Sequence, residues 1–173
     1  NDSFFDVRLE AIQQGNRIKK YAEHELLRKL KSSVENDSES KVRLAALTFL
    51  KENFPKDPDL LPLAQKILNQ DVSNLCKAKA LQILTTIDTS LVFQHIELWS
   101  EDQSSTIRIA LLLYYAEHGD EKSFARFQSA MNSSFLKGQD RMAAMLHLNT
   151  YLTRIKNQKI RLEGLTLLNK FYA

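Results

Sequence analysis

A short motif that recurs along the chain constrains its fold more than any other feature. In each copy a basic residue stands among small, β-branched and apolar residues, and alternating apolar residues and alanines follow it. The basic residue recurs at intervals of 35, 34, 31 and 33 residues, and a sixth copy at Arg161 follows after only 20. A repeated interval of this length is typical of chains built from stacked, similar units, and an atypical copy is typical of their ends. The five regularly spaced residues are Arg8, Arg43, Lys77, Arg108 and Arg141.

The apolar residues inside each unit are spaced as on one face of a helix. From Val42 onward they occur at i, i+3, i+4, i+7 and i+8, which is the spacing of an amphipathic α-helix. Leu44 and Leu47 lie off this stripe, so we expect the helix to bury two sides. The chain has only 4 Gly and 3 Pro, too few turn signals for a β-sandwich or barrel. The sequence therefore predicts an all-α fold.

The predicted architecture is a right-handed α-α superhelix of about ten helices in five hairpins. Hydrophobic residues make up 43% of the 173 residues, which is enough for a real core, and no linker is long enough to divide the chain. We therefore expect a single helical-repeat domain over residues 1–173. The predicted helices cover residues 4–14, 17–34, 39–54, 58–69, 73–87, 89–99, 103–118, 120–135, 139–155 and 157–172.

Two units carry the motif most fully. Residues 36–47 read NDSESKVRLAAL and residues 101–112 read EDQSSTIRIALL. An Asp- and Ser-rich turn followed by Val-Arg-x-Ala-Ala-Leu resembles the HEAT repeats of armadillo-like α-solenoids, and the resemblance covers nearly the whole chain. It implies a scaffold or interaction domain without a catalytic site of its own.

The resemblance also implies a ladder of Asp and Arg side chains that pair along the turns between neighbouring repeats. By this resemblance the candidate ladder residues are Asp37, Arg43, Asp102 and Arg108. The third unit departs from the pattern, because Lys77 replaces the arginine and Asn74 stands where an aspartate is expected.

A narrower resemblance concerns the start of the chain. Residues 5–12, FDVRLEAI, followed by such units are similar to the C-terminal helical region of bacterial aminopeptidase N-type zinc peptidases. In that family the region encloses the substrate cavity and holds no zinc ligand. The resemblance, and an opening at Asn1 rather than at a methionine, lead us to expect a fragment of a longer protein whose zinc, if any, lies in an upstream domain.

No residue of the chain itself is a candidate catalytic, cofactor or metal ligand. The string His24-Glu-Leu-Leu-Arg28 has an arginine where the HExxH zinc motif needs its second histidine. We therefore expect the fragment not to be an enzyme and to hold no cofactor. The single cysteine, Cys76, excludes an internal disulfide and is expected to pack at a helix start. No apolar run approaches ~18 residues, so no membrane span is predicted, and no feature indicates a compartment.

The basic C-terminal end supports an alternative function. Residues 137–173 carry seven Lys/Arg and two Asp/Glu, a surplus that suits nucleic acid, an acidic lipid surface or an acidic protein. The alternative is a HEAT-like nucleic-acid-binding protein or DNA glycosylase, with Trp99 available to stack on a base. Glu97 and Glu101 beside Trp99 would repel a phosphate backbone, which disfavours nucleic acid as the partner.

A protein, or an adjacent domain of the same chain, is the partner that the sequence favours. The first predicted helix is short and apolar on more than one side, and the candidate docking patch on it is Phe4, Phe5 and Leu9. We expect this end to face another domain and the basic C-terminal end to face solvent. A further apolar stripe over residues 142–152 indicates core packing or a groove for a partner helix: Met142, Met145, Leu146, Tyr151 and Leu152.

Overall fold

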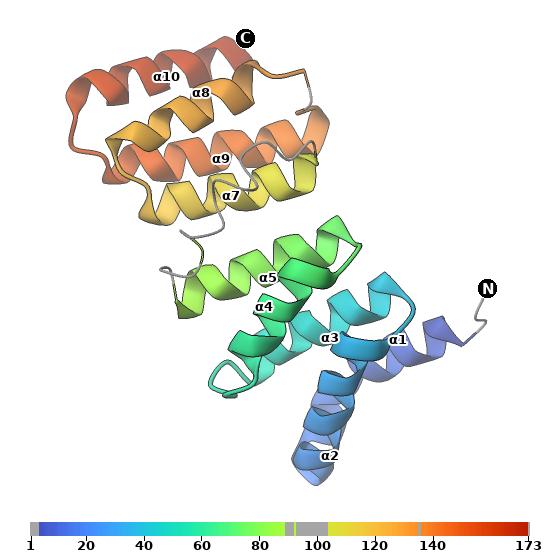
Figure 1. Cartoon of the computed structure of the whole chain (residues 1–173). Coiled ribbons are helices and arrows are strands. Elements are labelled where there is room, and N and C mark those ends of the chain that lie inside the picture. The colour runs from blue at the N-terminus through green and yellow to red at the C-terminus, as the bar shows by residue number, and fades with distance from the viewer. Residues whose placement is uncertain (1–3, 89–91, 93–103, 135, 173) are drawn as a thin grey trace. The chain divides into compact units, whose positions relative to one another are not determined.

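The computed structural model describes residues 4–88, 92, 104–134 and 136–172, and Figure 1 shows its helices. In these ranges the chain forms nine α-helices and one short 3-10 helix and has no strand, so the all-α prediction is confirmed. The chain divides into two compact units, residues 1–87 and residues 88–173. The single continuous superhelix over residues 1–173 stays a prediction, and each unit is described by itself.

The first unit is built from two layers of helices (Figure 1). In one layer α1 packs on α3 and α3 packs on α5, and in the other α2 packs on α4. The layers are joined chiefly where α2 packs on α3 and α4 packs on α5. The helices are α1 (Phe5–Gln13), α2 (Gly15–Asn36), α3 (Ser40–Asn53), α4 (Leu60–Gln70) and α5 (Asn74–Ile87).

The second unit has the same alternation of layers. Its helix α7 packs on α9, α8 packs on α10, and both α8 and α10 contact α9. The helices are α7 (Ser105–His118), the 3-10 helix η1 (Glu121–Ser123), α8 (Phe124–Asn132), α9 (Gly138–Arg154) and α10 (Gln158–Tyr172). The predicted helix over residues 89–99 lies outside the described residues except for Val92, which is helical and buried.

The recurring basic residue marks the same register in every unit. It is the fourth residue of its helix in α1, α3, α5, α7 and α9, and Arg161 is also the fourth residue of α10. All five helices with the regular interval belong to the layers α1–α3–α5 and α7–α9. From α1 to α3, from α3 to α5 and from α7 to α9, the interval seen in the sequence therefore corresponds to one helix pair with its two turns.

Apolar side chains from both layers form the core of each unit. In α3 the side chain of Leu47 is fully buried and that of Leu44 is half-buried, as expected for a helix packed against α1, α2 and α5. Burial of each large apolar side chain stabilises the fold by roughly 1.5–3 kcal/mol. Fully buried residues include Leu30, Leu50, Leu68, Leu81 and Leu84 in the first unit and Phe127, Met131, Leu148 and Tyr151 in the second.

Two backbone features shape the corner between α1 and α2. Gly15, the first residue of α2, is buried, and a Cβ there would lie 2.8 Å from a ring carbon of Phe49. This close approach requires a residue without a side chain. Farther along, Ala22 has non-helical backbone angles (φ −145°, ψ 49°), which mark a kink within α2. None of the described helices combines the length and the apolar character needed to cross a bilayer.

Candidate functional site

The turn between α4 and α5 is held by an ion pair that reaches it from α3. Arg43 donates from Nε to Oδ2 of Asp71 at 2.7 Å and from Nη2 to Oδ1 at 2.8 Å. The two side chains are only 11% and 2% exposed. A bidentate pair of this kind fixes the orientation of both groups as well as their distance.

The preceding turn is held in the same way. Arg8 of α1 donates from Nε and Nη2 to the two carboxylate oxygens of Asp37, at 2.8 and 3.0 Å. Arg43 also donates from Nη1 to the carbonyl oxygens of Asp37 and Ser38, at 2.9 and 3.0 Å, so it joins the two turns. We call the pairs Arg8–Asp37 and Arg43–Asp71 the ladder.

Each ladder aspartate also shapes its own turn. Asp37 accepts a hydrogen bond from the backbone N–H of Glu39, and Asp71 accepts one from the N–H of Ser73, so each carboxylate bonds two residues ahead in the same chain. Both aspartates stand three residues before the first residue of a helix. The carboxylates therefore stabilise the entry to α3 and α5 as well as the contact between repeats.

The charges of the second pair stabilise each other. Burial by itself would raise the pKa of Asp71, but hydrogen bonds from Arg43 and from the Ser73 N–H, with the positive charge of Arg43, lower it below its ordinary value. The hydrogen bond to Asp71 in turn raises the pKa of Arg43. Cys76 lies beside this pair: its thiol donates to the carbonyl oxygen of Ser40, and burial raises its pKa.

The structure brings two of the four predicted ladder residues into the ladder. Asp37 and Arg43 belong to it, although their side chains pair with Arg8 and Asp71 rather than with each other. Asp102 lies outside the described residues. In the third unit we expected the aspartate at the place of Asn74, but the carboxylate that pairs with Arg43 belongs to Asp71, three residues earlier. The signal was present: Asp71 follows Asp37 by 34 residues, the interval that separates Arg43 from Lys77.

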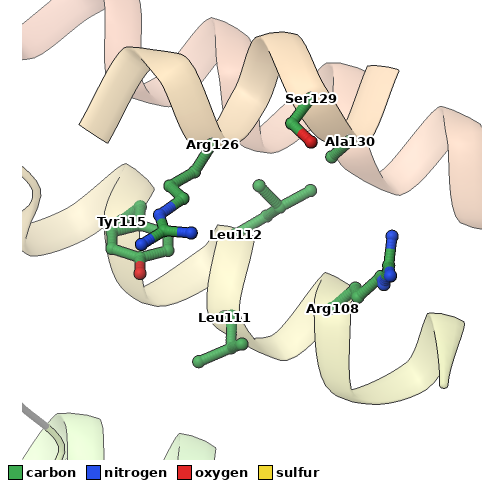
Figure 2. Close-up of a pocket in the computed structure, with 7 residues that line it drawn as sticks. All are labelled: Arg108, Leu111, Leu112, Tyr115, Arg126, Ser129 and Ala130. Atoms are coloured by element: carbon green, nitrogen blue, oxygen red, sulfur yellow. The ribbon is translucent and has the colours of Figure 1, made fainter. Parts of the chain in front are cut away.

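Arg108, the fourth predicted ladder residue, lies in the second unit at one end of a small cavity between α7 and α8. In Figure 2 Arg126 lies beside Tyr115 at the other end, and Leu112 lies between the two arginines. The cavity holds only about 60 Å³. Pockets for small-molecule ligands are usually ~300–1,000 Å³, so this cavity suits water better than a substrate.

The predicted docking patch is partly uncovered. Phe4 is 67% exposed, whereas Phe5 and Leu9 are half-buried. The Lys41 ammonium of α3 lies 5.8 Å from the centroid of the Phe5 ring. Val7, one turn from Phe4, is 63% exposed. The open part of the patch is therefore a surface made by Phe4 and Val7, on one side of α1.

Next to this surface, α1 and α2 form the walls of a groove of about 520 Å³. Ala11 lies on the same helix face as Phe4 and Val7, and it also lines the groove, so the exposed surface of α1 continues into it. The apolar part of the lining is Ala11, Ile12, Ile18, Ala22, Leu26 and Leu30, and the polar part is Arg8, Glu25, Arg28, Lys29, Ser32 and Ser33.

The C-terminal helices also expose apolar side chains. The stripe predicted over residues 142–152 divides: Met145, Tyr151 and Leu152 are buried, whereas Met142 and Leu146 are exposed. Leu162 and Leu165 of α10 are exposed as well. The basic C-terminal end, which we expected to face solvent, therefore carries four large exposed apolar side chains.

Several cations of this end interact inside their own unit. Arg154 donates from Nη1 to the carbonyl oxygen of Ala116 at 2.6 Å. The guanidinium of Arg141 lies 5.1 Å from the centroid of the Phe171 ring, and Lys170 donates to the amide oxygen of Asn132. These contacts reduce the share of the basic charge that is available to an external anion.

The other residues that could carry chemistry do not form a site among the described residues. Among the residues that the structure describes, no three His, Cys, Asp or Glu side chains lie together as a metal would require. Arg28, which takes the place of the second histidine of a zinc motif, bonds to Glu25 at 2.7 and 3.0 Å. Trp99, named for the glycosylase alternative, lies outside the described residues.

Comparison of this chain with models of protein families, with curated proteins and with solved structures finds no match.

Proposed function

We propose that this chain is a non-catalytic, HEAT-like helical-repeat scaffold that docks onto a protein, or onto another domain of its own chain, through its α1 end. The observation that carries the proposal is the exposed pair Phe4 and Val7 on a helix whose opposite side packs on α3. Two large apolar side chains left in water forgo several kcal/mol of burial, and such surfaces mark contact sites.

The repeat organisation supports the scaffold part of the proposal. The common fourth-residue register and the ladder Arg8–Asp37 and Arg43–Asp71 agree with the HEAT-like pattern of paired helices and paired turns. In stacked repeats each unit contacts its neighbours, and the surface side chains select the partner. A substrate-enclosing lobe of an aminopeptidase N-type peptidase stays a prediction that only the sequence resemblance supports.

A photocrosslinking experiment tests the docking surface. A photoreactive amino acid replaces Val7 in one variant and Val72 in the control. Val72 is 91% exposed and lies in the same unit, at the turn before α5. In cells that produce the protein we expect one discrete protein adduct at Val7 and none at Val72. The partner, once purified, should bind the unmodified chain and should bind Val7→Glu about tenfold more weakly or worse. A Val7 variant that folds but forms no adduct, or forms the same adducts as the control, would overturn the proposal.

The non-catalytic part has its own test. The purified chain, supplied with zinc, should leave aminoacyl-anilide substrates intact. Turnover that disappears when His24 or Glu25 is substituted would contradict this part of the proposal.

A further inference from the structure

The two layers of the first unit define where another helix would fit. α3 has α2 packed on it from the other layer, and α5 has α4 packed on it in the same way. Among the described residues α1 has no such full partner, because α2 packs chiefly on α3. The groove between α1 and α2 occupies the corresponding position: a helix there would contact α1 as α2 contacts α3, and would contact α2 as α4 does.

The size and lining of the groove suit a helix. Beyond the non-helical Ala22 its lining runs along α2 to Ser33, and at 1.5 Å per residue this is roughly 16 Å, or about three helical turns. Ile12, Leu26 and Leu30 are buried in its floor. A face of leucine-like residues at i, i+3, i+4 and i+7 is the complement of such a floor.

The charged side chains at the groove determine which sign of charge on a partner would be favourable. Arg28 and Lys29 line it with side chains that are 69% and 70% exposed. Glu25 is the only carboxylate of the lining, and it pairs with both Arg28 and Lys29, so these three side chains together keep one net positive charge. The remaining charged residue, Arg8, bonds to Asp37. The surplus of positive charge favours carboxylates on the partner, which would speed association and fix its orientation.

From the position, the lining and the charge we infer that the groove between α1 and α2 binds an amphipathic helix of a partner protein, with its apolar face on Ile18 and Leu26 and with carboxylates beside Arg28 and Lys29. The inference rests on the proposed scaffold function and names the class of partner. Because Phe4 and Val7 continue the α1 wall, the same partner would cover the exposed patch.

The probe is a synthetic, fluorescent, helix-forming peptide of about 16 residues with leucines on one face and glutamates on the flanks. A second peptide has lysines in place of the glutamates. In fluorescence anisotropy with the full chain we expect saturable binding of the Glu peptide and at least about fivefold weaker binding of the Lys peptide, with the difference reduced by salt.

Two variants locate the binding. Ile18→Asp places a charge in the apolar lining and should weaken binding of the Glu peptide by about tenfold or more, whereas Val72→Asp, outside the groove, should leave it unchanged. The charge reversal Arg28→Glu with Lys29→Glu concerns exposed side chains and should invert the preference toward the Lys peptide. Circular dichroism checks that each variant is folded, and the charge reversal decides the question if Ile18→Asp does not fold.

Absence of saturable binding by either peptide would overturn the inference, as would equal affinities for both peptides or binding that survives the substitutions. A dimer in light scattering that Ile18→Asp converts to a monomer would show that a second copy covers the groove, which also overturns it. If a partner crosslinks at Val7 but neither peptide binds, the scaffold function stands and only the acidic helix fails.

Discussion

The two units use the same helix register, but the basic residue of that register is held differently in α9 than in α1 and α3. In the first unit the fourth residue of α1 and of α3 is an arginine held by an aspartate in the next turn of its layer. In the second unit the fourth residue of α9, Arg141, lies over the Phe171 ring, and its Nε has no hydrogen-bond partner among the described residues. The first unit therefore joins these turns by ion pairs, whereas at the start of α9 an aromatic ring of the described residues contacts the cation.

The second unit fixes a turn from the opposite end of its helices. Tyr151, near the end of α9, is fully buried and donates its hydroxyl to the carbonyl oxygen of Asp120, at 2.8 Å, in the turn between α7 and α8. Its ring lies 4.9 Å from that of Phe127, between centroids. A repeated backbone geometry therefore determines where a turn needs a stabilising contact, while different side chains can provide that contact.

Removing one partner of the buried ion pair should have the largest effect. Asp71→Ala leaves Arg43 buried without its carboxylate and should lower the free energy of unfolding by about 3 kcal/mol or more, measured by urea denaturation. In hydrogen exchange we expect the loss of protection in α3 to α5. The control is Asp59→Ala, because Asp59 is exposed and Lys31 keeps its bond to Asp57; it should cost less than about 1 kcal/mol. Equal effects of the two substitutions would show that the ladder does not stabilise the first unit.

A matched pair of glycines compares packing in the two units. A Cβ at Gly15 would meet the Phe49 ring, and a Cβ at Gly164, inside α10, would meet the Leu152 side chain. Gly15→Ala should cost about 2 kcal/mol, because the ring can move only as a rigid body. Gly164→Ala should cost about 1 kcal/mol less, since alanine favours a helix interior and leucine can change rotamer. Thermal unfolding of the two variants measures the difference, and the reverse order would contradict this account.

The hydroxyl of Tyr151 should contribute less than the ladder pair. Tyr151→Phe keeps the ring and removes the bond to the Asp120 carbonyl, so we expect a loss of about 1 kcal/mol in urea denaturation. Tyr21→Phe is the control, because Tyr21 is exposed, and it should change nothing measurable. A loss as large as that of Asp71→Ala would make the two ways of holding a turn equivalent in energy.

Mild acid should have the smallest effect on stability, and the effect should differ between the two units. Burial lowers the pKa of His147 in α9, so the folded second unit favours the neutral imidazole. Its contribution is fully present above the unfolded pKa of about 6.5 and is lost as pH falls through the lower folded pKa. The lowered pKa of Asp71 acts in the other unit, where stability is kept until pH falls below about 4.

Between pH 7 and pH 5 we therefore expect hydrogen exchange to quicken in α7 to α10 and to change little in α1 to α5. His147→Gln should remove this dependence, because glutamine does not titrate. A change confined to the first unit, or one that persists in His147→Gln, would contradict the assignment to this histidine.

The register was predictable from the sequence, and the ladder partners were predictable only in part. The interval between Arg8 and Arg43 indicates the length of a repeat, because the later intervals, of 31 to 34 residues, are close to it. Asp71 was missed since its turn reads Asp-Val-Ser, without the run of Ser and Glu residues that marks the turn at Asp37. The identity of a partner across two turns depends on packing in three dimensions, which a spacing pattern does not contain.

The exposed surfaces were also predictable from the sequence only in part. Met142, Met145 and Leu146 all fit a helical apolar stripe, yet only Met145 is buried. Spacing identifies the apolar sides of a helix, but it does not tell which side meets a neighbour. The patch on α1 was predicted from its density of apolar residues, whereas the groove beside it depends on how α1 and α2 cross.

The position of Cys76 has a practical consequence for measuring motion. The chain has one cysteine, and its side chain, 1% exposed, lies at the turn that Arg43 and Asp71 hold. A thiol reagent can reach this sulfur only when α5 separates locally from α3, and the raised pKa further slows its reaction in the closed state. The rate at which a thiol reagent labels the protein therefore reports how often this one contact opens, without any substitution in the sequence.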